Sequence, residues 1–138
     1  MGLPMAVVLQ QGKADCGIAC LAMLLGKTYL EVYAASISKK YRDPQVQGMD
    51  VARLKRTARR LGTKLALRRA WDAETDAGLL TVEKLAPKVD DFLQHLVVLK
   101  WGLIFDTDGT VWEPDDYYAT LKYRPVSLIV EENTDADV

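Results

Sequence analysis

Residues that support covalent or metal-based chemistry are scarce in this sequence. Its 138 residues include two cysteines, Cys16 and Cys20, and one histidine, His95. Two cysteines four positions apart on one helix cannot build a disulfide framework, and two thiols with one imidazole leave a tetrahedral zinc site incomplete. We therefore expect no structural disulfide, no metal and no other cofactor, and a reducing, cytoplasmic setting.

The chain also lacks an excess of either charge and any long apolar run. Lys and Arg number 18 against 19 Asp and Glu, which produces no overall attraction to nucleic acid or to an anionic membrane. The apolar run Ile18 to Leu25 is far shorter than a membrane span, and Met1 to Leu9 lacks the basic start of a signal peptide. We expect a single domain over residues 1–138, without a membrane segment and with a solvated acidic tail over about 131–138.

Helices are predicted in the first half of the chain. A helix that is apolar on nearly every side follows Asp15, a good N-cap residue, and ends at Gly26. A second helix opens with a capping box at Thr28 and is expected to reach about Lys39. A third, capped by Asp50 and closed by Gly62, is expected from about Met49 to Leu61, where apolar residues recur at helical spacing.

The second half changes to strand signals. A short helix is also expected at Asp115–Leu121, and the stretch Trp71–Leu80 is predicted to be an acidic loop. The predicted strands are Thr63–Arg69, Leu93–Lys100, Leu103–Phe105 and Pro125–Val130. Helices followed by a small antiparallel sheet predict an α+β fold.

Cys16 is a candidate nucleophile because it falls in the first turn of the buried helix. Free N–H groups and the positive end of the helix dipole favour a thiolate there, but their effect is modest, so a neighbouring imidazolium is needed. His95 is the one imidazole in the sequence. Asp106 ends a strand that we expect to pair with the His95 strand, and its carboxylate could orient the ring. The N–H of Cys16 and the side chain of Gln10 or Gln11 are candidate oxyanion donors.

Several segments resemble the C39 family of papain-like cysteine peptidases, the bacteriocin-processing, double-glycine leader peptidases and their relatives. Asp15-Cys16-Gly17 matches the family's Asp-Cys-Gly signature, and Gln10 occupies the position six residues before the cysteine, where the family has Gln. The run His95-Leu96-Val97-Val98-Leu99 is similar to the family's His-x-Val-Val-Leu strand. Further matches are Pro87, eight residues before His95, and the helix signature Gly48 to Gly62.

The resemblance implies a papain-like fold and a stand-alone peptidase that acts on a peptide or protein, for example after a double-glycine leader. It implies Cys16 as nucleophile, His95 as general base and then acid, Gln10 as oxyanion donor and Asp106 as the orienting carboxylate. The family's Asp is usually followed by Pro, whereas Thr107 follows here, and the interval from His95 is shorter than in transporter-linked members. Asp108 therefore remains an alternative to Asp106.

Other functions compete with hydrolysis. A non-catalytic peptide-binding or partner-binding domain on the same fold is one alternative, and a transamidase or deamidase that uses the same thiol is another. The segment Asp106 to Thr110 imitates a phosphatase motif, but too little chain follows it, so an Asp-Gly turn is expected. Cys20 is expected in the core. The basic residues between Arg53 and Arg69 are predicted to form a solvated helix face, and the lack of interleaved aromatic residues argues against nucleic acid.

Overall fold

The computed structural model describes residues 6–12, 14–37, 48–88 and 93–132. Its helices are α1 (Cys16–Leu25), α2 (Tyr29–Ser36), α4 (Val51–Arg60) and α5 (Pro114–Leu121). Its strands are β1 (Leu65–Arg68), β2 (Gly78–Lys84), β3 (Gln94–Lys100), β4 (Leu103–Phe105), β5 (Val111–Trp112) and β6 (Tyr123–Glu131). The strands form one antiparallel sheet in the order β1-β6-β2-β3-β4-β5. The predicted α+β fold is confirmed.

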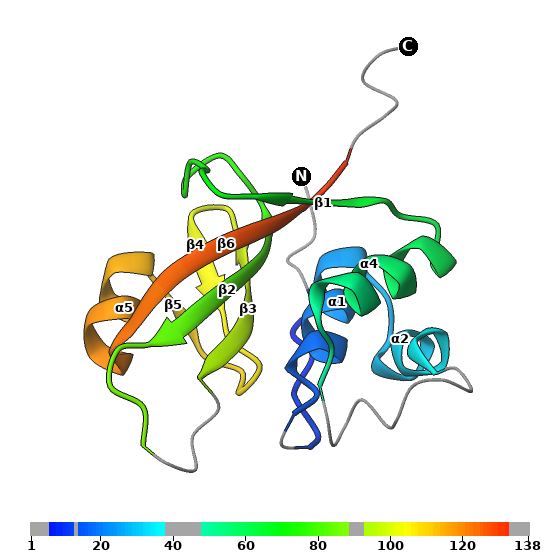
Figure 1. Ribbon diagram of the computed structural model, residues 1–138, viewed down its shortest axis with the longest axis horizontal. Helices are drawn as coiled ribbons and strands as arrows, with labels where there is room; N and C mark the ends of the chain where they lie inside the picture. Colours follow the sequence, from blue (N-terminus) through cyan, green and yellow to red (C-terminus); the bar gives the residue numbers. More distant parts are fainter. Residues whose placement is uncertain (1–5, 13, 38–47, 89–92, 133–138) are drawn as a thin grey trace.

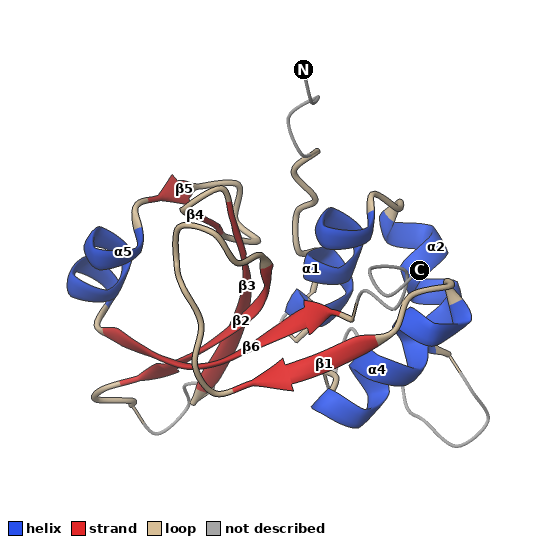
Figure 2. Cartoon of the chain, turned by 90° about the horizontal axis from the view of Figure 1, so that it is seen from above, coloured by secondary structure: helices blue, strands red, loops and turns tan. Residues whose placement is uncertain are grey.

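Helices cover both faces of this sheet. Helices α1, α2 and α4 lie together on one side, and α5 lies on the other (Figures 1 and 2). In β3, Leu96 and Val98 pack in the cluster beneath the first three helices, while Val97 and Leu99 pack in the cluster that contains Tyr117 of α5. A strand buried on both faces has no polar side, which explains the continuous apolar run that follows His95.

Helix α1 lies in the middle of the helical layer. Every residue from Gly17 to Leu24 is buried, and Gly26 ends the helix in the left-handed conformation at φ 67°. Among the described residues no single helix is long and apolar enough to cross a membrane, and the bent pair of α1 and α2 meets those criteria only when the two are counted together. The apolar character of α1 is explained by its central place in the core.

The other two helices of this layer are capped as the sequence indicates, with one difference in length. Thr28 and Glu31 form the reciprocal capping box of α2, and the Asp50 side chain accepts a hydrogen bond from the N–H of Arg53 in α4. Helix α2 ends at Ser36, so the expected extension to about Lys39 is wrong: Ile37 is already extended, at φ −79° and ψ 136°. Lys39 itself lies outside the described residues.

The basic residues of α4 do not all form a solvated face. The Arg53 side chain is 6% exposed, and its guanidinium donates to the carbonyl of Ser36 at 3.0 Å. Arg60 donates to the carbonyls of Ala35 and Ile37. The last carbonyls of a helix have no partner within that helix, so these two arginines satisfy them and fasten α4 to the end of α2.

The sheet differs from the sequence prediction at β2 and at the end of the chain. The predicted loop Trp71–Leu80 is wrong in its last three residues, because β2 begins at Gly78 and pairs with both β3 and β6. The acidic residues before Gly78 favour a loop, and the strand that follows them was therefore not predicted. The tail was also expected to begin at residue 131, but Glu131 belongs to β6 and Glu132 forms an ion pair with Lys64; residues 133–138 lie outside the described part.

Candidate active site

The Asp15 carboxylate holds the loop that precedes Cys16. It is 1% exposed and accepts hydrogen bonds from the backbone N–H groups of Gln11 (2.9 Å) and Gly12 (2.8 Å) and from the Tyr29 hydroxyl of α2. Asp15 occupies the N-cap position of α1 but makes no side-chain capping bond. The expected capping role is therefore wrong, because the carboxylate turns back to the loop. As a result the loop is fixed against the helix that carries Cys16.

The first turn of α1 presents Cys16 at the edge of the helical layer. Cys16 is the first residue of the helix and is partly exposed. Gly17 follows it in a crowded position: a Cβ atom there would lie 3.1 Å from Met49 Cε and 3.3 Å from Leu54 Cδ2, so these side chains would have to shift by a few tenths of an ångström. The absence of a side chain at Gly17 lets the beginning of α4 pack closely beside the thiol.

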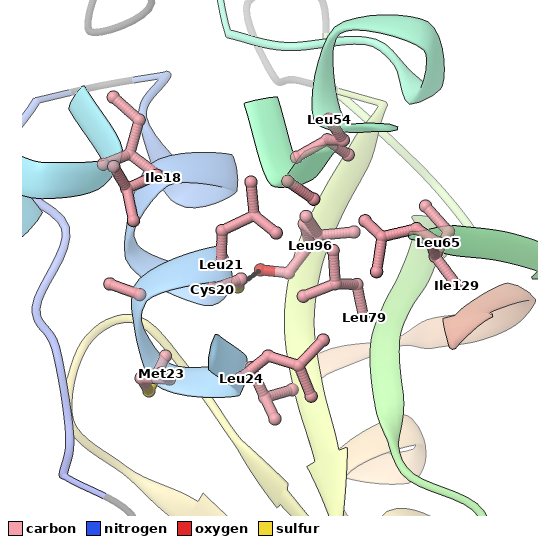
Figure 3. Packing of buried hydrophobic residues seen from close by; sticks show 14 of the residues in the cluster. Ile18, Cys20, Leu21, Met23, Leu24, Leu54, Leu65, Leu79, Leu96 and Ile129 are labelled. Carbon is pink, nitrogen blue, oxygen red and sulfur yellow. Dashed lines mark hydrogen bonds between the residues drawn. The ribbon is translucent and has the colours of Figure 1, made fainter. Parts of the chain in front are cut away.

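Cys20 fixes the distance between α1 and β3. Its thiol donates to the carbonyl of Leu96 at 3.1 Å, and both residues lie within the packed core (Figure 3). Burial raises the pKa of the Cys20 thiol well above its ordinary value, and the charges of Cys16 and Asp106 add to this effect. Cys20 is therefore a neutral core residue, as expected. Cys20 lies one turn after Cys16 and Leu96 adjoins His95, so this bond joins α1 to β3 close to the two candidate catalytic residues.

A pocket of about 230 Å³ lies where α1, α4, β2 and β3 meet. Cys16 and His95 both line it, although 79 positions separate them along the chain. The start of α4 contributes apolar walls through Met49, Val51 and Leu54. The structure thus brings together the thiol and the imidazole that the sequence singled out.

The His95 ring is held by a buried carboxylate. Its Nε2 atom lies 2.8 Å from Oδ1 of Asp106, which directly follows β4 and is 6% exposed. The antiparallel pairing of β3 with β4 produces this approach, as expected from the sequence. Asp108 does not compete for the ring, since its Oδ1 accepts from the backbone N–H of Thr110 at 2.9 Å. With Nε2 engaged by Asp106, Nδ1 is the ring nitrogen that remains for another partner.

The surroundings of His95 favour the protonated ring. Burial by itself lowers the pKa of His95, but the hydrogen bonds with Asp106 and Cys16 and the charges of both partners raise it from 6.5 to about 9. Burial alone would raise the pKa of Asp106, but the hydrogen bond and charge of His95, followed by the bonds from Tyr117 and Thr107, lower it. The pair is therefore an imidazolium and a carboxylate near neutral pH. An imidazolium beside a thiol is the arrangement that stabilises a thiolate.

The pKa of His95 can be measured directly, because the chain has one histidine and hence a single set of imidazole resonances. In a nuclear magnetic resonance titration we expect the folded chain to show a midpoint near 9, since the protonated ring persists until that pH. The same chain in urea should show about 6.5. Asp106→Asn should lower the folded midpoint, because it removes the negative charge and leaves burial to oppose protonation. A folded midpoint at or below 6.5 would contradict the geometry described here.

Gln10 lies beside Thr107 and not on the described lining of the pocket. Its backbone N–H donates to the carbonyl of Thr107 at 2.9 Å, and its Oε1 accepts from the Thr107 hydroxyl at 2.8 Å. Its Nε2 donates to the carbonyl of Gly12 at 2.8 Å. An amide nitrogen carries two N–H groups, so one donor of Nε2 remains for another acceptor. Gln11, the alternative donor, has an exposed side chain and a backbone N–H bonded to Asp15.

Two residues of this site were missed in the sequence. Tyr117 of α5 is fully buried, and its hydroxyl donates to Oδ2 of Asp106 at 2.9 Å. Burial and the Asp106 carboxylate raise the pKa of Tyr117, so its hydroxyl remains a donor. No local pattern marks this residue, because its partner comes from another element. Thr107 could have been noticed in the sequence, because it occupies the position where the resembled family usually has proline.

The chain is similar to a known family of proteins. A search of curated proteins found no match. The model of the peptidase C39 family matches residues 5–100, which include Gln10, Cys16 and His95. The four described helices and the six-stranded antiparallel sheet agree with the papain-like fold of that family. A match over this much of the sequence shows that the chain belongs to the peptidase C39 family, a family of peptidases.

Proposed function

We propose that this chain is a cysteine peptidase that cleaves a peptide bond with Cys16 as nucleophile. The observation that carries the proposal is the shared pocket of Cys16 and His95, in which Nε2 of His95 is bonded to the buried Asp106 carboxylate. A nucleophile, a base and a group that orients the base are the three parts that acyl transfer needs. Membership in a peptidase family supplies the class of substrate, a peptide or a protein.

The first half of the reaction transfers the acyl group to the enzyme. The Cys16 thiolate attacks the carbonyl carbon, a C–S bond forms, and the electron pair of the C=O bond moves to oxygen. The N–H of Cys16 and the Gln10 amide stabilise this oxyanion. As the pair returns, the C–N bond breaks, and the proton of the His95 imidazolium passes to the leaving amine.

The second half releases the acyl group. His95, now neutral, removes a proton from water, and the hydroxide oxygen attacks the thioester carbonyl. The C–S bond then breaks, which regenerates the thiolate of Cys16 and liberates a carboxylate. Asp106 holds the ring in one orientation through both halves, because its carboxylate stays hydrogen-bonded to Nε2.

We propose further that the bond cleaved follows a double-glycine type of leader. Small residues before the cut allow a peptide backbone to approach the first turn of α1, where Met49 and Leu54 crowd Gly17. The apolar walls formed by Met49, Val51 and Leu54 suit an apolar side chain of the leader. Co-expression with double-glycine precursors and mass spectrometry of the products tests this choice of substrate.

The proposed nucleophile is tested with a glycine-terminated peptide electrophile that alkylates an activated thiol. We expect one label per wild-type chain at Cys16 and none in Cys16→Ala, because the labelled atom is removed. Cys20→Ser is the matched control: it keeps a hydroxyl donor for the Leu96 carbonyl and should be labelled like wild type. Labelling that survives Cys16→Ala and disappears in Cys20→Ser would overturn the assignment.

The products formed in water enriched in ¹⁸O separate peptide-bond hydrolysis from the alternatives, since a deamidase would incorporate ¹⁸O at a side-chain carboxyl group without cleaving the chain. Hydrolysis of a peptide bond places one ¹⁸O atom in the new C-terminal carboxylate, since water attacks the thioester. Transfer to an added amine without ¹⁸O would indicate a transamidase instead. Binding of peptide without any cleavage by the wild-type chain would indicate a non-catalytic binding domain.

A further inference from the structure

Thr107 contacts both Gln10 and Asp106. It is 3% exposed, and its backbone N–H donates to Oδ1 of Asp106 at 2.6 Å. Its carbonyl accepts from the backbone N–H of Gln10 at 2.9 Å, and its hydroxyl donates to Oε1 of Gln10 at 2.8 Å. Two of these bonds join the segment before α1 to the turn after β4, two segments 97 positions apart in sequence, and the third lies within the turn.

These bonds select one orientation of the Gln10 amide. Oε1 points to the Thr107 hydroxyl, and Nε2 points to the carbonyl of Gly12 at 2.8 Å. An inverted amide would place two carbonyl oxygens, Oε1 and the oxygen of Gly12, at hydrogen-bonding distance with no proton between them. The observed orientation thus keeps the remaining N–H of Nε2 as a donor in a fixed direction.

The bonds at Asp106 are also specific to the residue type. Proline, the usual residue after this aspartate in the resembled family, has no N–H and no hydroxyl. It could accept the bond from the backbone of Gln10, but it could make neither the bond to Asp106 nor the bond to the Gln10 side chain. Thr107 therefore adds contacts to both groups: its N–H donates to the carboxylate that holds His95, and its hydroxyl lies 2.8 Å from Gln10 Oε1 and, more distantly, 3.4 Å from Asp106 Oδ1.

We infer that Thr107 is a positioning residue whose hydroxyl holds the Gln10 amide in place as an oxyanion donor while its backbone holds Asp106. The inference rests on the proposed peptidase function. Charge on the substrate oxygen develops in the tetrahedral state. Misplacing this donor therefore reduces the stabilisation of the transition state and leaves the binding of the ground-state substrate unchanged. Loss of the hydroxyl should therefore lower kcat and leave KM nearly unchanged.

The test compares Thr107→Val, which has the same shape without the hydroxyl, with Thr107→Ser, which retains it. We expect Thr107→Val to lower kcat about tenfold, because removal of a whole oxyanion donor costs about a hundredfold or more. Thr107→Ser should recover most of that loss. A peptide aldehyde, whose adduct with Cys16 carries the same developing charge, should bind Thr107→Val about tenfold more weakly.

Alkylation of Cys16 by iodoacetamide supplies the reference reaction, because it creates no oxyanion. Its rate and pH profile should be the same in Thr107→Val and wild type. A general disturbance of the site would change the rate, the pH profile or both. In a Gln10→Ala background, Thr107→Val should cause no further loss of kcat, since the residue acts through Gln10.

Two results overturn the inference: wild-type kcat in Thr107→Val, or equal losses in alkylation and aldehyde binding. Both leave the proposed function standing, provided that the wild-type chain cleaves peptides. A wild-type chain that is not alkylated at Cys16 and does not cleave peptides refutes the proposed function itself.

Discussion

Replacement of His95 by alanine is expected to lower kcat/KM for a peptide substrate by about a thousandfold. His95 is the base and acid of the proposed reaction, and such a group contributes on the order of 10² to 10⁴ in rate. The same variant also removes the imidazolium from the pocket of the proposed nucleophile, and a neighbouring cation of this kind favours the reactive form of a cysteine. Alkylation of Cys16 near neutral pH should therefore slow in parallel, and iodoacetamide kinetics across the pH range measure this second effect.

Asp106 and Asp108 form a matched pair of variants for the orienting group. Asp106→Asn should lower kcat/KM about a hundredfold or more, because the amide cannot supply the negative charge that holds His95 as imidazolium. Asp108→Asn should stay within about twofold of wild type, since an amide oxygen can still accept the bond from Thr110 that closes the turn. A larger loss in Asp108→Asn than in Asp106→Asn would transfer the orienting role to Asp108.

The second large effect concerns stability and comes from a glycine in the centre of the sheet. A Cβ atom at Gly78 would lie 2.3 Å from the carbonyl oxygen of Ile129, closer than real Cβ contacts allow. Strand β2 pairs with β6 on this side and with β3 on the other. The side chain would therefore separate two central strands, and we expect Gly78→Ala to lower the free energy of unfolding by about 3 kcal/mol.

Gly26→Ala is the control for this substitution. Gly26 has a positive φ of 67° but no atom within 4 Å of the added Cβ, so the variant carries backbone strain without a steric clash. Its expected cost is about 1 kcal/mol. Urea denaturation of the two variants and the wild type measures both values. A Gly78→Ala variant no less stable than Gly26→Ala would show that β2 and β6 can separate at little cost.

Both large effects depend on contacts between separate helices and strands. The clash at Gly78 exists because β6, near the end of the chain, lies beside β2. His95 reaches Asp106 because β3 and β4 form a hairpin, and it reaches Cys16 because α1 packs on β3 through the bond from Cys20 to Leu96. Substitutions in the centre of the sheet are therefore expected to disturb the site as well as the core.

The sequence by itself determined the features that depend on neighbouring residues. The turn at Gly26, the capping box at Thr28 and the cap at Asp50 are local hydrogen-bond patterns, and all three occur where expected. The candidates Gln10, Cys16, His95 and Asp106 also came from the sequence, through the chemistry of their side chains and the resemblance of the segments around them. Such patterns can be recognised in the sequence alone because they involve residues that are close together or at fixed spacings along the chain.

The tertiary structure alone decided the features that depend on distant segments. It separated Asp106 from Asp108 as the partner of His95, bonded the Asp15 carboxylate to the Tyr29 hydroxyl of α2, and placed Thr107 against Gln10. It also showed that the residues after the acidic loop form β2 between β3 and β6. Each result depends on contacts between side chains of different elements. The free energy of these contacts comes from burial and strand pairing, which involve more than one segment of the chain.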